Sequence, residues 1–198
     1  MLETSKFIDY SILVLIGLFI VGKANIWFKL KKSKAEIVEK QSVWNGFFAL
    51  AAFFIGVTHG WEGGMKFGHC ELHGPTGHLG LLFVLVGVAL NFFAERSLGE
   101  MWHMDAVIYG NHRIVKSGPY AWCSHPIYLA EFLILFGMAF HSMNMAGFLF
   151  VALFLFEIRM RSRTETNLLM KHFPDEYGAY LAKDTSLGKG VHTNSKRS

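Results

Sequence analysis

The feature that most constrains this chain is a series of five apolar runs separated by polar stretches. A membrane-spanning helix needs roughly 20 predominantly apolar residues, and the first three runs approach or reach that length. The last two are shorter, with only the polar residues 141–144 between them. The runs are Ile8–Phe28, Val43–Trp61, Leu79–Glu95, Ile127–Phe140 and Met145–Ile158. They predict an integral membrane protein with about five spans.

These spans are expected to be helices, because backbone groups inside hydrocarbon must form their hydrogen bonds within the segment. A membrane barrel would need alternation with period two, and the runs show none. The two short runs are predicted to form a tight helical hairpin, since Pro126 suits a first helical turn and Arg159 begins the exit. The first run lacks a small-residue cleavage site and precedes a lysine-rich loop, which favours a retained span over a signal peptide. The predicted fold class is therefore all-α.

The distribution of basic residues predicts the orientation. Lysines are concentrated between Lys23 and Lys40, and lysines and arginines recur from Arg159 to the C-terminus. By the positive-inside rule both segments are cytoplasmic, so the N-terminus lies outside and the C-terminus inside. Five spans satisfy this parity and also place the loop from Arg96 to Ser124 in the cytoplasm. The membrane would be a bacterial inner membrane or the endoplasmic reticulum.

Charge and cysteine content exclude other classes. The net charge of +4 comes from residues at the ends of the apolar runs, which is typical of membrane orientation and not of nucleic-acid binding. Cys70 and Cys123 are too few for a disulfide framework and fit no metal-ligand spacing. At 198 residues, the chain is expected to be a single membrane domain.

Three segments on the predicted cytoplasmic side carry residues suited to chemistry. In residues 111–128, Gly118-Pro119 marks a turn, and His125-Pro126 opens the fourth span, where free backbone amides can bind a carboxylate or ribose. In residues 157–165, Arg161 and Glu165 are four apart and share one face of a helix. Residues 172–181 form an aromatic-bearing, helical tail. Taken singly, each has a simpler explanation, such as an interfacial aromatic belt or positive-inside anchors.

Together, "GPYAWCSHPIY", "RSRTE" and "HFPDEYGAYL" resemble the isoprenylcysteine carboxyl methyltransferase family, within a wider group that includes phospholipid methyltransferases. The shared patterns are G-x-Y, H-P-x-Y, R-x-x-x-E and F-x-x-E-Y, in that order. The resemblance covers about residues 105–182, and the N-terminal spans match only as generic membrane helices. It implies a cofactor pocket for S-adenosyl-L-methionine at the cytoplasmic interface and a lipophilic methyl acceptor.

The resemblance also implies roles for individual residues. Arg161 falls where the family has an arginine that contacts the acceptor. The cofactor-binding positions are His112, Arg113, Ile114, Val115, Tyr120, His125, Pro126, Ile127, Tyr128 and Glu165. The physical requirements agree, because a ribose suits a carboxylate such as Glu165, and aromatic faces stabilise a positively charged sulfonium. No resident metal is implied.

This sequence departs from the family pattern on the acceptor side. Ser124 replaces the arginine that commonly precedes His125, and Glu131 lies within the fourth span, where ionisable groups are costly and often functional. Glu131 either faces the pocket, as a base for an amine or thiol acceptor, or pairs with Arg159 or Arg161. Arg161 favours the carboxylate of a prenylated cysteine as acceptor, whereas Glu131 favours an amine.

The loop before the third span is rich in histidine. It contains His59, His69, Cys70, His73 and His78. His69 and His73 have the i, i+4 spacing of a helical metal site, but the surrounding glycines and the predicted external location favour an exposed loop without metal. Two rival classes follow: a non-catalytic metal-binding membrane protein, and an NADPH-dependent membrane reductase of the sterol type.

The predicted organisation is one membrane domain, 1–198. Three spans occupy 8–95, the cofactor-binding catalytic region occupies 105–182, and a flexible basic tail occupies 183–198. The predicted function is methyl transfer to a prenylated cysteine. Methylation of a phospholipid amine or a small thiol is the alternative.

Overall fold

The computed structural model describes residues 17, 37–41, 75–103, 105–142 and 145–184. The predicted spans 8–28 and 43–61, four of the loop residues discussed above (His59, His69, Cys70 and His73) and residues 185–198 of the tail lie outside this set. Four helices are described: α3 (Pro75–Leu98), α4 (Pro126–Ser142), α5 (Met145–His172) and α6 (Pro174–Asp184). Two strands, β1 (Ile37–Gln41) and β2 (Ala106–Tyr109), and two short 3-10 helices, η1 (Gly99–Met101) and η2 (Gly118–Ala121), complete the list.

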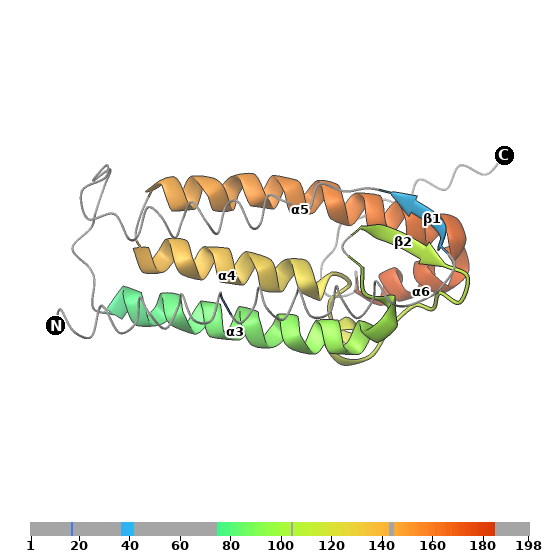
Figure 1. Cartoon of the computed structure of the whole chain (residues 1–198), viewed down its shortest axis with the longest axis horizontal. Coiled ribbons are helices and arrows are strands. Elements are labelled where there is room, and N and C mark those ends of the chain that lie inside the picture. The colour runs from blue at the N-terminus through green and yellow to red at the C-terminus, as the bar shows by residue number, and fades with distance from the viewer. Residues whose placement is uncertain (1–16, 18–36, 42–74, 104, 143–144, 185–198) are drawn as a thin grey trace.

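Helices α3, α4 and α5 lie side by side along the long axis of the molecule (Figure 1). The predicted hairpin is present, because α4 ends at Ser142 and α5 begins at Met145. However, α5 continues without a break to His172, well past the predicted end of the apolar run at Ile158. Charged residues are good helix formers, so the loss of apolar character after Ile158 does not end the helix.

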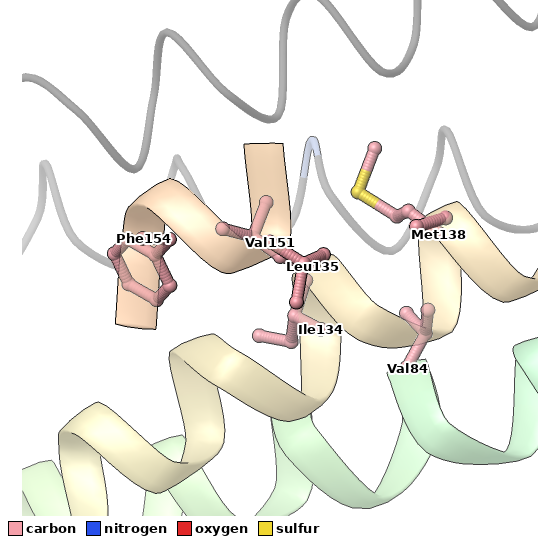
Figure 2. Close-up of a cluster of buried hydrophobic side chains, with 7 residues drawn as sticks. Val84, Ile134, Leu135, Met138, Val151 and Phe154 are labelled. Atoms are coloured by element: carbon pink, nitrogen blue, oxygen red, sulfur yellow. The ribbon is translucent and has the colours of Figure 1, made fainter. Parts of the chain in front are cut away.

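Helices α3 and α4 approach each other closely through glycines. A Cβ atom built on Gly137 would lie 2.6 Å from the carbonyl oxygen of Gly80, and one built on Gly87 would lie 2.8 Å from that of Ala130. Small residues permit this backbone contact between membrane helices. A cluster of buried side chains joins these two helices to α5 (Figure 2), and its members are Val84, Ile134, Leu135, Met138, Ala139, Val151 and Phe154.

The described residues are mostly helical, as predicted, but they also include one small sheet that an all-α fold would lack. Strands β1 and β2 form a two-stranded antiparallel sheet at the end of the molecule that also holds α6 (Figure 1). All four residues of β2 are buried, and Ala106 and Ile108 pack with Leu168 of α5. A buried segment must satisfy its backbone polar groups, and β1 supplies the partners. Residues 37–41 of the lysine-rich segment therefore lie at the same end as the loop between α3 and α4.

The described helices are consistent with a membrane environment. By length and composition, one of them is apolar enough to cross a membrane over His78–Met101, and α4 is a shorter apolar helix. Large apolar side chains on α3, among them Leu82, Leu85 and Phe93, are exposed. His78, predicted to lie in a loop, belongs to α3, because this helix begins at Pro75 and not at Leu79. Proline is favoured in a first helical turn, where its missing amide costs no hydrogen bond.

Candidate functional site

The site begins at the first turn of α4. Pro126 is the first helical residue and is buried, and the carbonyl oxygen of His125 accepts the backbone N–H of Leu129 at 3.2 Å. This hydrogen bond holds His125 at the helix start, with its ring stacked on that of Tyr128 at a centroid separation of 5.5 Å. The sequence His125-Pro126 therefore fixes two aromatic rings where α4 meets the loop. Ile127, between them, is partly buried.

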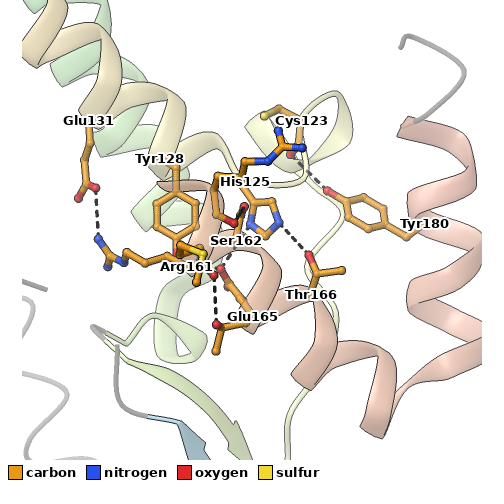
Figure 3. Close-up of polar contacts among 12 residues, drawn as sticks. Cys123, His125, Tyr128, Glu131, Arg161, Ser162, Glu165, Thr166 and Tyr180 are labelled. Carbon is orange, nitrogen blue, oxygen red and sulfur yellow. Dashed lines mark hydrogen bonds and ion pairs between the residues drawn. The ribbon is translucent and has the colours of Figure 1, made fainter. Parts of the chain in front are cut away.

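Glu165 on α5 is the acceptor that both rings share. Its Oε2 accepts a hydrogen bond from the Tyr128 hydroxyl at 3.1 Å and lies 3.3 Å from Nδ1 of His125. The other ring nitrogen of His125 lies 3.2 Å from the hydroxyl of Thr166. In the described part of the chain both contacts of Glu165 use Oε2, so Oε1 is left for a ligand. Figure 3 shows this group between α4 and α5.

The pKa of Glu165 favours a carboxylate. Burial alone would raise the pKa of this side chain. The contacts with His125 and Tyr128, together with the charge of Arg161, outweigh burial and hold the pKa below its usual value. Glu165 is therefore an anion at neutral pH, suited to the hydroxyl groups of a ribose or to a positively charged ligand.

Arg161 lies one turn before Glu165 and is almost fully buried. Its guanidinium carbon is 5.0 Å from the centre of the Tyr128 ring, and its Nη1 is 3.9 Å from Oε2 of Glu131. The same Nη1 is 3.4 Å from Oε1 of Glu157. Glu131 therefore pairs with Arg161, as predicted for one of its two orientations, and this contact is compatible with a position beside the pocket (Figure 3).

The Gly-Pro turn lies beside this group and is held by α6. Gly118 has a φ of 61°, which favours glycine, and Tyr120 of η2 is buried. The Tyr180 hydroxyl of α6 donates a hydrogen bond to the carbonyl oxygen of Tyr120 at 2.7 Å and lies 3.3 Å from that of Cys123. Burial, and next the charge of Glu165, raise the pKa of Tyr120, so its hydroxyl stays protonated.

The segment of residues 112–115 divides into two parts. The His112 ring stacks between Tyr109 and Phe173, at centroid separations of 6.4 and 5.6 Å. Its Nδ1 is buried and has no hydrogen-bond partner among the described residues. Ile114 and Val115 are partly buried, whereas Arg113 is exposed and forms no ion pair within the part of the chain that the structure describes.

Comparison of the sequence with models of known protein families gives a match. Residues 79–171 match the model of the isoprenylcysteine carboxyl methyltransferase family. This segment, a little under half of the chain, is similar to the isoprenylcysteine carboxyl methyltransferase family. A search of curated proteins gave no significant match. The match supports a membrane-bound methyltransferase of the isoprenylcysteine type.

The extent of this match differs from that of the sequence resemblance. The match begins at Leu79, so it includes most of α3, which the motifs treated as a generic span. It ends at Lys171, before the aromatic tail of α6. In the structure α3 packs closely against α4 at Gly80 and Gly87, and α4 carries Tyr128 in its first turn.

The residues gathered around Glu165 fit S-adenosyl-L-methionine. A carboxylate oxygen of Glu165 is available for ribose hydroxyls. The aromatic rings of His125 and Tyr128 suit a sulfonium, and the buried Nδ1 of His112 can accept or donate one hydrogen bond to a ligand. Among the described residues no group of three or more side chains could hold a metal ion.

Sequence reasoning missed three members of the site: Thr166, Tyr180 and Glu157. Thr166 follows Glu165 directly, but its contact with His125 depends on the packing of α4 against α5. Tyr180 lies in the aromatic tail, and its bonds to the turn require the fold of α6 over η2. For Glu157 a signal existed, since it precedes Arg161 by four residues on the same helix.

Proposed function

We propose that this protein transfers a methyl group from S-adenosyl-L-methionine to a lipophilic acceptor at the membrane interface. The observation that carries the proposal is the carboxylate of Glu165, which His125 and Tyr128 hold at the point where α4 leaves the loop. Glu165 lies on α5 beyond the end of the apolar run at Ile158. This position supports a site at the membrane interface, open to water for the cofactor and to the bilayer for the acceptor.

The contributions of the protein are binding, orientation and exclusion of water. When bound, the cofactor supplies an electrophilic methyl group on a positively charged sulfur. His125 and Tyr128 would hold this charge against their ring faces, and Glu165 would fix the ribose. His112, Tyr120, Pro126 and Ile127 would form the apolar wall of the same site, with Arg113, Ile114 and Val115 as further family positions.

Arg161 and Glu131 would act on the acceptor side. A guanidinium can hold a carboxylate in bidentate geometry, so Arg161 suits the prenylcysteine carboxylate that the family name implies. An amine is the second candidate acceptor. It is favoured because Arg161 already contacts two carboxylates, those of Glu131 and Glu157.

Replacing Glu165 by glutamine tests the cofactor assignment. Glu165→Gln is expected to weaken S-adenosyl-L-methionine binding by about 1–3 kcal/mol, the scale for losing a charged hydrogen-bond partner. Calorimetry on detergent-solubilised protein measures this, with the exposed Glu176→Gln as the matched control. Unchanged affinity in a folded Glu165→Gln protein would remove this residue from the site, and binding of NADPH in place of S-adenosyl-L-methionine would favour a reductase.

The proposed orientation places the site in the cytoplasm. Lysines of the segment before β1 and basic residues after α5 support a cytoplasmic end that holds β1, β2 and α6. A reporter fused after Ser198 is expected to give a cytoplasmic signal, and one inserted at residues 62–76 an external signal. The reverse result at residues 62–76 would contradict the five-span topology.

A further inference from the structure

Three charged side chains, those of Glu131, Arg161 and Glu157, lie next to the Glu165 group on the side of the apolar helix segments. Along α4, His125, Tyr128 and Glu131 follow one another at successive turns. Along α5, Glu165, Arg161 and Glu157 do so in the opposite chain direction. The pair Glu131 and Glu157 therefore lies on the membrane side of the proposed cofactor position, where an acceptor entering from the bilayer would place its headgroup.

This arrangement leaves Arg161 poorly suited to hold an acceptor carboxylate. Its Nη1 contacts Glu131 and Glu157 at 3.9 and 3.4 Å, and its guanidinium carbon lies over the Tyr128 ring at 5.0 Å. A third carboxylate would have to displace one of the two, and like charges in a poorly solvated site repel strongly. Bidentate capture of a prenylcysteine would therefore separate an ion pair that is already buried.

Glu157, in contrast to Arg161, needs a further partner of opposite charge. Its side chain is 13 % exposed, and both carboxylate oxygens are buried without a hydrogen-bond donor of good geometry among the described residues. Within the same residues its cationic neighbour is Arg161, which it shares with Glu131. A buried carboxylate that shares one cation is stabilised by a second cation or by an N–H donor. Neither family position nor sequence motif assigns a role to Glu157.

We propose that the methyl acceptor is the nitrogen of a lipophilic amine and that Glu157, with Glu131, binds it. The inference rests on the proposed function, since it names the acceptor of that same site. An ammonium group beside Glu157 gives two carboxylates and two cations, counting Arg161, whereas an acceptor carboxylate gives three anions around one cation. Glu157 is then a specificity-determining residue and Arg161 is a positioning residue for both carboxylates.

The transfer balances with these groups. An ammonium acceptor first gives one proton to the carboxylate of Glu157 or Glu131, which leaves a neutral amine with a lone pair. That lone pair forms the new N–C bond to the methyl group of the sulfonium donor. The S–C bond breaks, and its electron pair stays on sulfur, which becomes a neutral thioether. The methylated ammonium carries the positive charge and lies beside the second carboxylate.

Binding without the methyl donor tests the charge preference directly. The probes are dodecylamine, dodecanoate and dodecanol in nonionic detergent, measured by calorimetry with the full-length protein. The wild type is expected to bind the amine at least about tenfold more tightly than the carboxylate, the factor that one charge-assisted contact provides. Glu157→Gln should remove most of this preference and leave dodecanol binding unchanged. Glu131→Gln is the second variant, and Glu176→Gln on exposed α6 is the matched control.

Methyl transfer supplies the second readout. With labelled S-adenosyl-L-methionine, label is expected on a lipid amine and not on the carboxylate of a farnesylcysteine analogue. Tighter binding of dodecanoate, an unchanged preference in folded Glu157→Gln and Glu131→Gln, or label on the analogue or on dodecanethiol would overturn the amine assignment. Failure of the wild type to bind S-adenosyl-L-methionine would instead refute the proposed function, while the donor-free binding would still decide the preference of Glu157.

Discussion

Helix α4 presents two faces of different character to its neighbours. Toward α3 it offers Gly137 and the backbone of Ala130, and the two helices approach until carbonyl oxygens limit the distance. Toward α5, at its N-terminal end, it offers His125, Tyr128 and Glu131, which meet polar side chains. One face has no room for an added carbon, whereas the other carries polar side chains that form hydrogen bonds and ion pairs with α5.

The difference separates the fixed part of the structure from the part available to a ligand. Close backbone packing stabilises one helix position, because a shift of α4 against α3 would produce a clash. Polar groups between α4 and α5 gain less from packing and remain able to exchange partners. The α3–α4 contact therefore positions the first turn of α4, and the α4–α5 contact carries the chemistry.

The largest effect is expected from a side chain added to the face of α4 that packs against α3. Gly137→Val is expected to lower the free energy of unfolding by about 3 kcal/mol, the upper part of the range for overpacking, because its Cβ would meet the Gly80 carbonyl at 2.6 Å. Thermal unfolding in detergent measures the loss. Gly110→Ala, whose added carbon has open space around it, is the control. Equal melting temperatures for the two variants would show that α3 and α4 are not in close contact.

A second test concerns the turn that borders the polar face. Tyr180→Phe removes the hydroxyl that bonds to the carbonyl oxygens of Tyr120 and Cys123, and should cost about 1 kcal/mol, the usual value for one hydrogen bond. The α6 helix should then exchange its amide hydrogens faster, while those of α3 and α4 stay protected. Hydrogen exchange measures this, with the exposed Ala179→Ser as control. Faster exchange throughout α3 would mean that the two faces of α4 are not independent.

Local sequence patterns were sufficient to predict the apolar helices. Apolar runs predicted α3, α4 and the start of α5, and Pro126 marked the start of α4. The partners across α4 and α5 could also have been inferred, because a tight hairpin places residues at equal separations from its turn opposite each other. Glu131 and Glu157 are each 13 residues from Asn144.

Long-range contacts were not predictable in this way. The β1–β2 pair joins residues 37–41 to residues 106–109, and the pairing depends on tertiary burial of β2, which five residues of β1 do not encode. The ion pair of Glu39 with Lys171 has the same origin. Residues of the site that bond across elements, such as Thr166 and Tyr180, depend on these contacts and carry no motif of their own.

The smallest expected effect is a pH dependence at the edge of the polar face. Burial, and also the positive charge of nearby His172, lower the pKa of His112, although Glu165 opposes this shift. Because the folded state binds this proton less tightly than the unfolded state does, the contribution of His112 to stability is complete above the unfolded pKa of about 6.5. It is lost as the pH falls through the lowered folded value.

The melting temperature of the wild type should therefore fall more between pH 7.5 and pH 5 than that of His112→Gln. His141→Gln, altered at the opposite end of α4, should keep the slope of the wild type. Parallel profiles for the wild type and His112→Gln would show that this ring is solvated and is not stacked between Tyr109 and Phe173.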